Sequence, residues 1–321
     1  MIDVSSFNFR AIFYNSHDEF SQIKRFCWIA SGLAKISASY ASSLCELNSK
    51  VTSDFYTPLK YKINKNKSEF DMPILVTLGG KGSDALDIAN LIYDNEDVMG
   101  LVTANIDSSI IPLFMKKDSF LCIGEYPKQD KRFVNINGIV CLTHLCEKFV
   151  SVIYSSVNVF DLELLDYRDI MLKSKHISNC IINVKNWQEK IIILGVGYNS
   201  FYEHTWRSIL QESGISSIRW QDIKDFTHGE HQYIGLCKEK YIFLILETDD
   251  VTEYAEMFEC RFENISQVHR IKLSNSIQRS FWENLYYVIY LSNELSIHLG
   301  FDGKRPPKNE LVDSWRNWGR L

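Results

Sequence analysis

The chain has 321 residues and a mass of 37.4 kDa, which is enough for two domains of ordinary size. Hydrophobic residues make up 45% and charged residues 23%, values that exclude a disordered chain or a fibre. The formal net charge of -5 gives no overall positive field for a nucleic-acid backbone, so we expect no nucleic-acid partner.

The apolar runs argue against a membrane partner. Ile191 to Val196 and Tyr241 to Leu246 are far shorter than the roughly 20 residues that a membrane helix needs. Residues 1 to 10 lack the basic and then apolar order of a secretory signal, and the eight cysteines are scattered, mostly within apolar stretches. We therefore expect a cytoplasmic protein.

In the first half, short apolar runs alternate with longer amphipathic segments. This is the pattern of parallel strands joined by crossover helices, so the predicted fold class is α/β with mostly parallel sheets. The predicted strands are Phe26 to Ala30, Ile74 to Leu78, Met99 to Ala104 and Phe120 to Gly124. Helices are predicted at Ala34 to Asn48, at Ser83 to Asp94 and in a long segment after Gly138. The lysine-rich and asparagine-rich segment Tyr61 to Asp71 is predicted to be an exposed loop.

Cys141, His144 and Cys146 are close enough in sequence to suggest zinc, but they lie in an apolar helical pattern. Helical spacing puts the two cysteines on different faces, and no second pair of ligands follows. We favour buried helix packing and predict neither a metal nor a cofactor.

The second half repeats this order of elements. Strands are predicted at Ile191 to Leu194, Ser217 to Trp220, Tyr241 to Glu247 and Val268 to Leu273, and a long helix at Ile277 to Leu299. The segment Asp161 to Lys190 mixes charges and has no glycine or proline, so we predict a bridge there. The predicted domains are 1–165 and 166–321.

Three glycine-bearing turns follow predicted strands, where a parallel sheet places its ligands. They are Ala30 to Leu33, Thr77 to Asp84 and Gly195 to Ser200. Amides at a helix start attract phosphate or carboxylate, although glycine can also be present only because the chain turns sharply there. Neither nucleotide motif is complete, because Ser200 stands where the third glycine of a dinucleotide fingerprint belongs and Lys81 is followed by no P-loop pattern.

The stretch from Ile191 to Tyr233 resembles sugar isomerase (SIS) domain proteins, notably the isomerase part of glucosamine-phosphate synthase. The turn Gly195 to Gly197, the helix that ends at Glu212, and Asp225-Phe226-Thr227-His228-Gly229 match the family's spacing. The first half resembles the other SIS repeat, and the segment after Gly300 resembles the C-terminal tail. The resemblance implies tandem three-layer αβα sandwiches, with most of the chain from about residue 25 covered.

The resemblance also assigns roles in aldose–ketose interconversion, which needs a ring-opening group and a base. It gives ring opening to His228, from a neighbouring subunit of a homodimer, and proton transfer to Glu212. Without it, Glu212 would be a solvated carboxylate and His228 a turn residue. The predicted substrate-binding residues are Ser31, Gly32, Gly79, Gly80, Lys81, Ser83, Gly197 and Lys308.

The phosphate loop departs from the family, because Gly79, Gly80, Lys81 and Asp84 occupy most positions that are usually serine or threonine. Lys81 could bind a phosphate, but Asp84 would oppose it. Two hypotheses follow. The first is a sugar or sugar-phosphate isomerase or deglycase, and the second is a non-catalytic SIS module that binds a carbohydrate derivative or scaffolds a partner protein.

Overall fold

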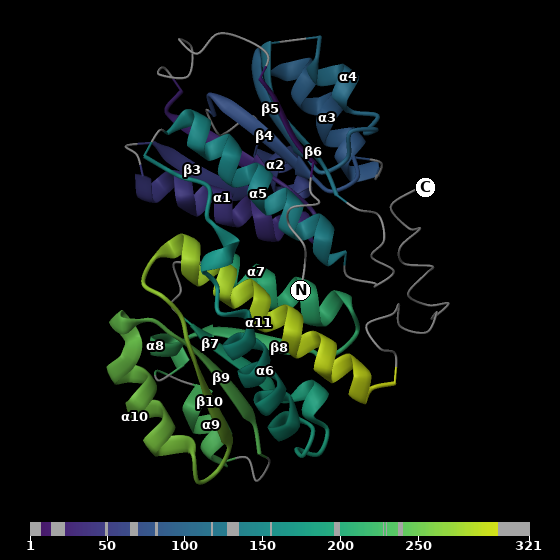
Figure 1. The fold of residues 1–321 in the computed structure, drawn as a ribbon. Helices are drawn as coiled ribbons and strands as arrows, with labels where there is room; N and C mark the ends of the chain where they lie inside the picture. The colour runs from purple at the N-terminus through teal and green to yellow at the C-terminus, as the bar shows by residue number, and fades with distance from the viewer. Residues whose placement is uncertain are drawn as a thin grey trace. The chain divides into compact units, whose positions relative to one another are not determined.

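The computed structural model describes residues 8–13, 23–48, 51–64, 70–80, 83–116, 118–126, 135–154, 156–195, 200–226, 228, 230–236 and 240–300. The chain divides into two compact units, and the division falls between Val159 and Phe160. Figure 1 shows the helices and strands of each unit. That residues 1–165 and 166–321 are each a complete SIS-like domain stays a prediction.

The first unit is built on a sheet whose strand order is β1-β6-β5-β4-β2-β3. Strands β2 to β6 pair in parallel, whereas β1 runs antiparallel to β6, with Asn8 opposite Glu125 and Phe13 opposite Phe120. The elements of this unit are β1 (Asn8–Phe13), β2 (Arg25–Ile29), α1 (Ala34–Asn48), β3 (Thr52–Tyr56), α2 (Pro58–Asn64), β4 (Met72–Thr77), α3 (Ser83–Asn95), β5 (Val98–Thr103), α4 (Ile111–Phe114), β6 (Asp118–Glu125) and α5 (Ile136–Ile153).

Alternating side chains of β2 fill the two faces of this sheet. Trp28 packs edge-to-face against Phe149 of α5, with ring centroids 5.5 Å apart. Cys27 and Ile29 point to the opposite face and join a core that includes residues of α2, α3 and α4. The sheet is therefore the middle layer of a three-layer αβα sandwich, with helices on both faces (Figure 1).

One loop prediction for the first unit was wrong. The segment Tyr61 to Asp71 was expected to be an exposed loop, but α2 extends to Asn64. Tyr61 is only 1% exposed, and its hydroxyl donates to Glu96 Oε1 at 3.0 Å. Residues 65–69 of the predicted loop lie outside the described residues. Burial of the Tyr61 ring in the core therefore stabilises the helix, although the residues around Tyr61 are polar.

Helix α5 is a core helix of the first unit. Among the described helices it alone is long and apolar enough to cross a membrane, yet 72% of it is buried inside the protein. Cys141 and Cys146 are both fully buried, which confirms that they serve helix packing. Burial raises the pKa of the Cys141 thiol to about 12, so the thiol stays protonated at neutral pH.

The second unit has an all-parallel sheet whose strand order is β10-β9-β7-β8. Phe226, Phe243, Phe258 and Phe262 pack together on one face, where α8 and α10 lie. The elements are η3 (Leu162–Leu164), α6 (Tyr167–Ile181), η4 (Trp187–Glu189), β7 (Ile191–Gly195), α7 (Ser200–Trp206), η5 (Arg207–Gln211), β8 (Ile218–Asp222), α8 (Ile223–Phe226), α9 (Glu230–Leu236), β9 (Ile242–Glu247), η6 (Asp249–Val251), α10 (Thr252–Phe262), β10 (Gln267–Lys272) and α11 (Ile277–His298).

Helix α11 joins α6 and α7 to form the other helical layer of this unit. Two buried hydrogen bonds fix its register on α7. The Tyr202 hydroxyl donates to Ser280 Oγ at 2.9 Å, and the Trp206 indole donates to Asn284 Oδ1 at 2.8 Å. Both sheets thus carry helices on two faces, and the predicted α/β class with mostly parallel sheets is confirmed.

Candidate functional site

The strand order locates the candidate site of the first unit. From β2 the chain first goes to β3 on one side and then crosses to β4 on the other, so the order reverses between β2 and β4. Ligands of such sheets bind beyond the carboxyl ends of the strands at this point of reversal. Two of the predicted glycine turns, which follow β2 and β4, meet there.

The turn after β2 carries Ser31 and Gly32. Its first amide, that of Ala30, donates to the Tyr56 carbonyl at 3.1 Å, which anchors the turn to β3. Gly32 has a φ of +55°, a conformation that favours glycine, and the Gly32 carbonyl accepts from the Lys35 amide at the start of α1. The Ser31 side chain is exposed. These two predicted residues therefore present a hydroxyl and open backbone beyond the carboxyl end of β2.

The turn after β4 requires glycine at position 80. Gly80 has a φ of +60°, and its amide donates to Thr77 Oγ1 at 3.0 Å. A Cβ atom at Gly80 would overlap the Ser108 hydroxyl and would lie 2.9 Å from Ser108 Cβ. At the neighbouring Gly79, by contrast, an added Cβ would meet nothing within 4 Å. Gly80 is thus fixed by packing, while Gly79 offers open backbone to a ligand.

The segment after β5 supports this turn with polar side chains. The Asn105 amide donates to the Gly79 carbonyl at 2.8 Å, and the Ser109 hydroxyl donates to the Gly80 carbonyl at 3.3 Å. Ser108 is 4% exposed, and its hydroxyl has no hydrogen-bond partner among the described residues. A buried hydroxyl beside an open glycine turn is suited to donate to an oxygen of a ligand.

Sequence reasoning missed Asn105, Ser108 and Ser109. A signal was present for Asn105, because it directly follows the predicted strand Met99 to Ala104 and so lies at the same carboxyl ends, whereas Ser108 and Ser109 lie further along the loop. Of the predicted substrate-binding residues, Lys81, Gly197 and Lys308 lie outside the described residues. Ser83 begins α3, but its side chain also lies outside the described part.

Glu212 of the second unit follows a π-helical turn. Helix α7 changes to the π-helix η5 at Arg207, and Glu212 is the exposed residue that caps its end. The neighbouring Gln211 side chain donates to the Ile218 carbonyl at 3.1 Å, so this turn lies beside the start of β8. Such π-helical turns often occur at functional sites.

His228 lies beyond the other end of the same strand. It follows β8 and the short helix α8, its amide donates to the Asp225 carbonyl at 3.0 Å, and its side chain is exposed. Five residues of β8 at about 3.3 Å each span roughly 15 Å. Within one copy of the chain, β8 therefore separates His228 from Glu212.

Gly195, at the end of β7, lies beneath the Trp220 ring of β8. A Cβ at Gly195 would approach Trp220 Cη2 to 2.5 Å, so only glycine fits under the indole. The strand end that leads into the third glycine turn is thus closely packed. Within the described ranges, no group of three or more His, Cys, Asp or Glu side chains is arranged to hold a metal ion.

No family model and no curated protein matches the chain. Solved structures do match. The C-terminal domain of glucosamine-fructose-6-phosphate aminotransferase from Francisella tularensis is 14% identical with a TM-score of 0.68, and the match covers 90% of this chain and 88% of that chain. Tagatose-6-phosphate ketose/aldose isomerase from Escherichia coli is 13% identical with a TM-score of 0.70, covering 91% and 89%.

Glucosamine-6-phosphate deaminase from Thermotoga maritima is similar to the same extent. It is 14% identical with a TM-score of 0.68, and the match covers 92% of each chain. These matches span nearly whole chains at low sequence identity, so they show a shared fold. The predicted architecture of αβα sandwiches with mostly parallel sheets is therefore confirmed.

Proposed function

We propose that the chain binds a sugar or sugar phosphate at the carboxyl ends of β2 and β4 and acts as an isomerase or deglycase. The observation that carries this proposal is the Gly79–Gly80 turn at the point of strand reversal. Its backbone is held by Thr77, Asn105 and Ser109, and a buried hydroxyl lies beside it. The fold shared with proteins named for hexose-phosphate chemistry supports the same class of ligand.

In this proposal the glycine turns bind the ligand's anionic group. In the first unit Gly32, Gly79 and Gly80 supply backbone, Ser31 and Ser83 supply hydroxyls, and Lys81 supplies positive charge. Gly197 and Lys308 are proposed as further substrate-binding residues. A phosphate carries up to two negative charges near neutral pH, so amides and lysines together can balance it.

The proposed isomerase chemistry needs only proton transfers. His228 opens the sugar ring by moving a proton between ring oxygen and the anomeric hydroxyl. The Glu212 carboxylate takes the proton from C2 of the open aldose and returns it to C1, while the hydroxyl proton moves between the oxygens. Atoms and electrons balance without an oxidant, and the proposal includes no cofactor or metal.

We also propose a cytoplasmic homodimer of two tandem SIS domains, residues 1–165 and 166–321. Because β8 separates Glu212 from His228 in one copy, a second copy supplying His228 would let both act on one sugar. Cys27, Cys122, Cys141, Cys146, Cys180 and Cys260 are free thiols, which suits a reducing compartment.

A second candidate is a SIS module that binds a carbohydrate derivative or scaffolds a partner protein without turnover. The observation that favours it is the exposure of both Glu212 and His228 at opposite ends of β8. A base that works on carbon is usually shielded from water, and neither side chain is buried.

A thermal-shift screen followed by a turnover assay tests the proposal. We expect a hexose phosphate or an amino-sugar phosphate to raise the Tm of the wild type by several degrees at saturating concentration. Glu212→Gln should keep this shift but reduce kcat at least 100-fold, because removing a general base typically costs that much. His228→Ala should reduce turnover of the closed sugar more than that of an open-chain analogue.

Matched control variants carry the same changes at exposed positions elsewhere. Glu189→Gln and His298→Ala should leave both the thermal shift and kcat unchanged. A ligand that binds wild type and Glu212→Gln alike, with no turnover by either, would reject the enzyme and favour the binding module. No shift from any sugar or sugar phosphate would reject both carbohydrate hypotheses.

A further inference from the structure

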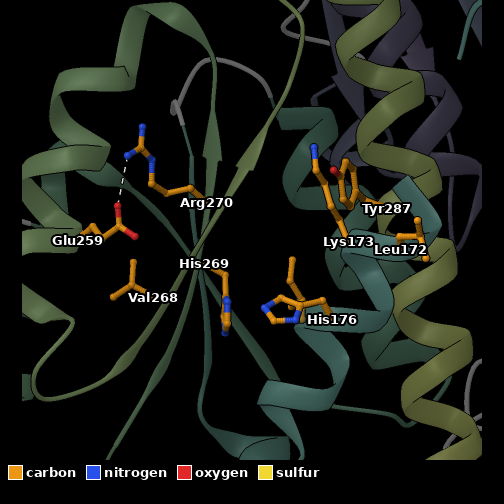
Figure 2. A pocket seen from close by; sticks show the side chains of 9 residues that line it. Leu172, Lys173, His176, Glu259, Val268, His269, Arg270 and Tyr287 are labelled. Carbon is orange, nitrogen blue, oxygen red and sulfur yellow. Dashed lines mark hydrogen bonds and ion pairs between the residues drawn. The ribbon is translucent and has the colours of Figure 1, made fainter. Parts of the chain in front are cut away.

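A cavity of about 480 Å³ lies beside β10 in the second unit (Figure 2). β10 and β8 are opposite edges of the sheet, so the cavity is at the edge away from β8, next to which Glu212 and His228 lie. It is lined by side chains of α6, α10, β10 and α11, namely Leu172, Lys173, His176, Ile177, Glu259, Val268, His269, Arg270 and Tyr287. Because no three potential metal ligands converge in the described part of the chain, the lining is not that of a metal site.

The cavity follows an open edge of the sheet. β10 is the last strand in the order β10-β9-β7-β8, and it pairs only with β9 among the described strands. The Gln267 amide donates to the Tyr241 carbonyl, and the Leu273 amide donates to the Glu247 carbonyl. Alternate residues of a strand point their backbone groups to opposite sides. The amides and carbonyls of residues 268, 270 and 272 therefore point outward.

The α10 side of this edge is acidic. Arg270 donates to Glu247, with Nε–Oε2 at 2.6 Å, and also contacts Glu259 at 3.2 Å and Glu256 at 3.5 Å. Charged side chains on an edge strand normally discourage pairing with another strand. Here three carboxylates face two cations, Arg270 and Lys272, whose Nζ lies 4.0 Å from Glu247 Oε1. This side therefore keeps a net negative charge, and Glu256, 59% exposed, presents it to the edge.

The α6 side of the edge is largely apolar and aromatic. Leu172, Ile177 and Tyr287 line it, together with the imidazoles of His176 and His269 (Figure 2). Burial, and then the nearby His176, lower the pKa of His269, which favours its neutral form. Lys173 is neutralised by Asp169 at 2.7 Å. A side chain entering from this direction would therefore meet apolar surface.

We propose that the β10 edge is a docking site for an extended peptide segment that alternates basic and apolar residues. Side chains of an added strand point alternately to the two faces of a sheet. Lysine or arginine residues would then face Glu256 and Glu259, apolar residues would face Leu172 and Tyr287, and the outward backbone groups of 268, 270 and 272 would pair with the segment.

Charge argues against a second copy of this edge as the occupant. Two copies of β10 could pair antiparallel about a two-fold axis normal to the sheet. The α10 face of one copy would then continue into the α10 face of the other. Glu256 and Glu259 of one copy would then oppose the same glutamates of the other, and like charges repel. A basic partner segment avoids this repulsion.

A fluorescent eight-residue peptide that alternates lysine and valine tests the proposal by anisotropy on the full chain. We expect it to bind at least tenfold more tightly than the matched peptide that alternates glutamate and valine. Its affinity should fall as the salt concentration rises. Amide hydrogen exchange at residues 268, 270 and 272 should slow on saturation, whereas exchange at residues 267, 269 and 271 should stay unchanged.

Two variants separate docking from folding. Val268→Pro removes an outward amide and leaves the bonds to β9 intact, and Glu256→Lys reverses an exposed charge. Each should weaken the lysine–valine peptide at least tenfold, while Glu189→Lys, at an exposed site outside the cavity, should not. Val268 is partly buried, so the proline variant could fail to fold. In that case the peptide affinity of Glu256→Lys tests the docking site.

Unchanged exchange at residues 268, 270 and 272 under saturating peptide would overturn the proposal. The proposal would also be overturned if these amides were protected without peptide and lost this protection when residues 301–321 are removed. In that case the chain itself would occupy the edge. Protection that grows with protein concentration would identify a second copy as the occupant and would equally overturn it. None of these results bears on the sugar site, whose test uses different ligands and variants.

Discussion

Replacing Gly80 with alanine is expected to destabilise the first unit by about 3 kcal/mol and to abolish sugar-phosphate binding. A left-handed conformation costs an alanine about 1–2 kcal/mol. The new Cβ would also overlap the buried Ser108 hydroxyl and would lie 2.9 Å from Ser108 Cβ, which rotation of the hydroxyl cannot move away. Urea denaturation measures the loss of stability, and the thermal-shift screen measures the loss of binding.

Gly79→Ala is the matched control, because an added Cβ there meets no atom within 4 Å and the backbone is not left-handed. Its stability should equal that of the wild type. Combining Gly80→Ala with Ser108→Gly removes the overlap but not the conformational cost, so it should recover about half of the lost stability. Equal stability of Gly80→Ala and wild type would contradict the packing argument.

Arg270→Ala should destabilise the second unit by about 3 kcal/mol at pH 7. Glu247 is 3% exposed, and the Arg270 guanidinium binds it through two nitrogens. Removing one partner of a buried pair typically costs about 3–5 kcal/mol. The lower value applies here, because Glu247 would keep the Thr252 hydroxyl at 3.2 Å and Lys272 at 4.0 Å. Urea denaturation at pH 7 compares the variant with the wild type.

The same pair sets a pH dependence with a definite sign. Hydrogen bonds from Arg270 lower the pKa of the Glu247 carboxyl below its usual value of 4.5. The contribution of the pair to the free energy of unfolding is therefore fully present above pH 4.5, and it is lost as the pH falls through the lowered pKa of Glu247. The difference between wild type and Arg270→Ala should shrink between pH 7 and pH 3.

An exposed ion pair provides the control for this experiment. Arg279 contacts Glu283 one turn away at 2.9 Å, and the two side chains are 46% and 15% exposed, against 18% and 3% for Arg270 and Glu247. Arg279→Ala should cost less than about 1 kcal/mol at any pH, because water screens such pairs. If the Arg270 and Arg279 variants lost equal stability, burial of Glu247 would not explain the effect.

Strands buried on both faces could be predicted from sequence, as could β8 and β10 at the edges of the second sheet, but β1 and β3 at the edges of the first sheet could not. β2, β4, β5 and β9 are continuous apolar runs, and their predicted bounds lie within two residues of those observed. β3 carries Ser53 and Asp54 and has no such pattern. Its place is fixed by tertiary contacts, including the hydrogen bond from the Trp28 indole to Ser53 Oγ at 3.1 Å.

The candidate site was predictable only where chain order brings residues to strand ends. Ser31, Gly32, Gly79 and Gly80 follow strands directly, so the pattern of the α/β fold located them. Ser108 lies several residues past β5, and its approach to Gly80 depends on how the loop folds back. Glu212 and His228 were chosen by resemblance, and their roles stay predictions.

The antiparallel pairing of β1 with β6 has a consequence for synthesis on the ribosome. Asn8 pairs with Glu125, and these residues are 117 positions apart (125 minus 8). At a synthesis rate of about 5–20 residues per second, β1 would wait about 6–23 seconds for its partner. The first described strand of this unit is therefore placed in its sheet only after the last one has been made. Until then, its backbone is open to chaperones and to neighbouring nascent chains.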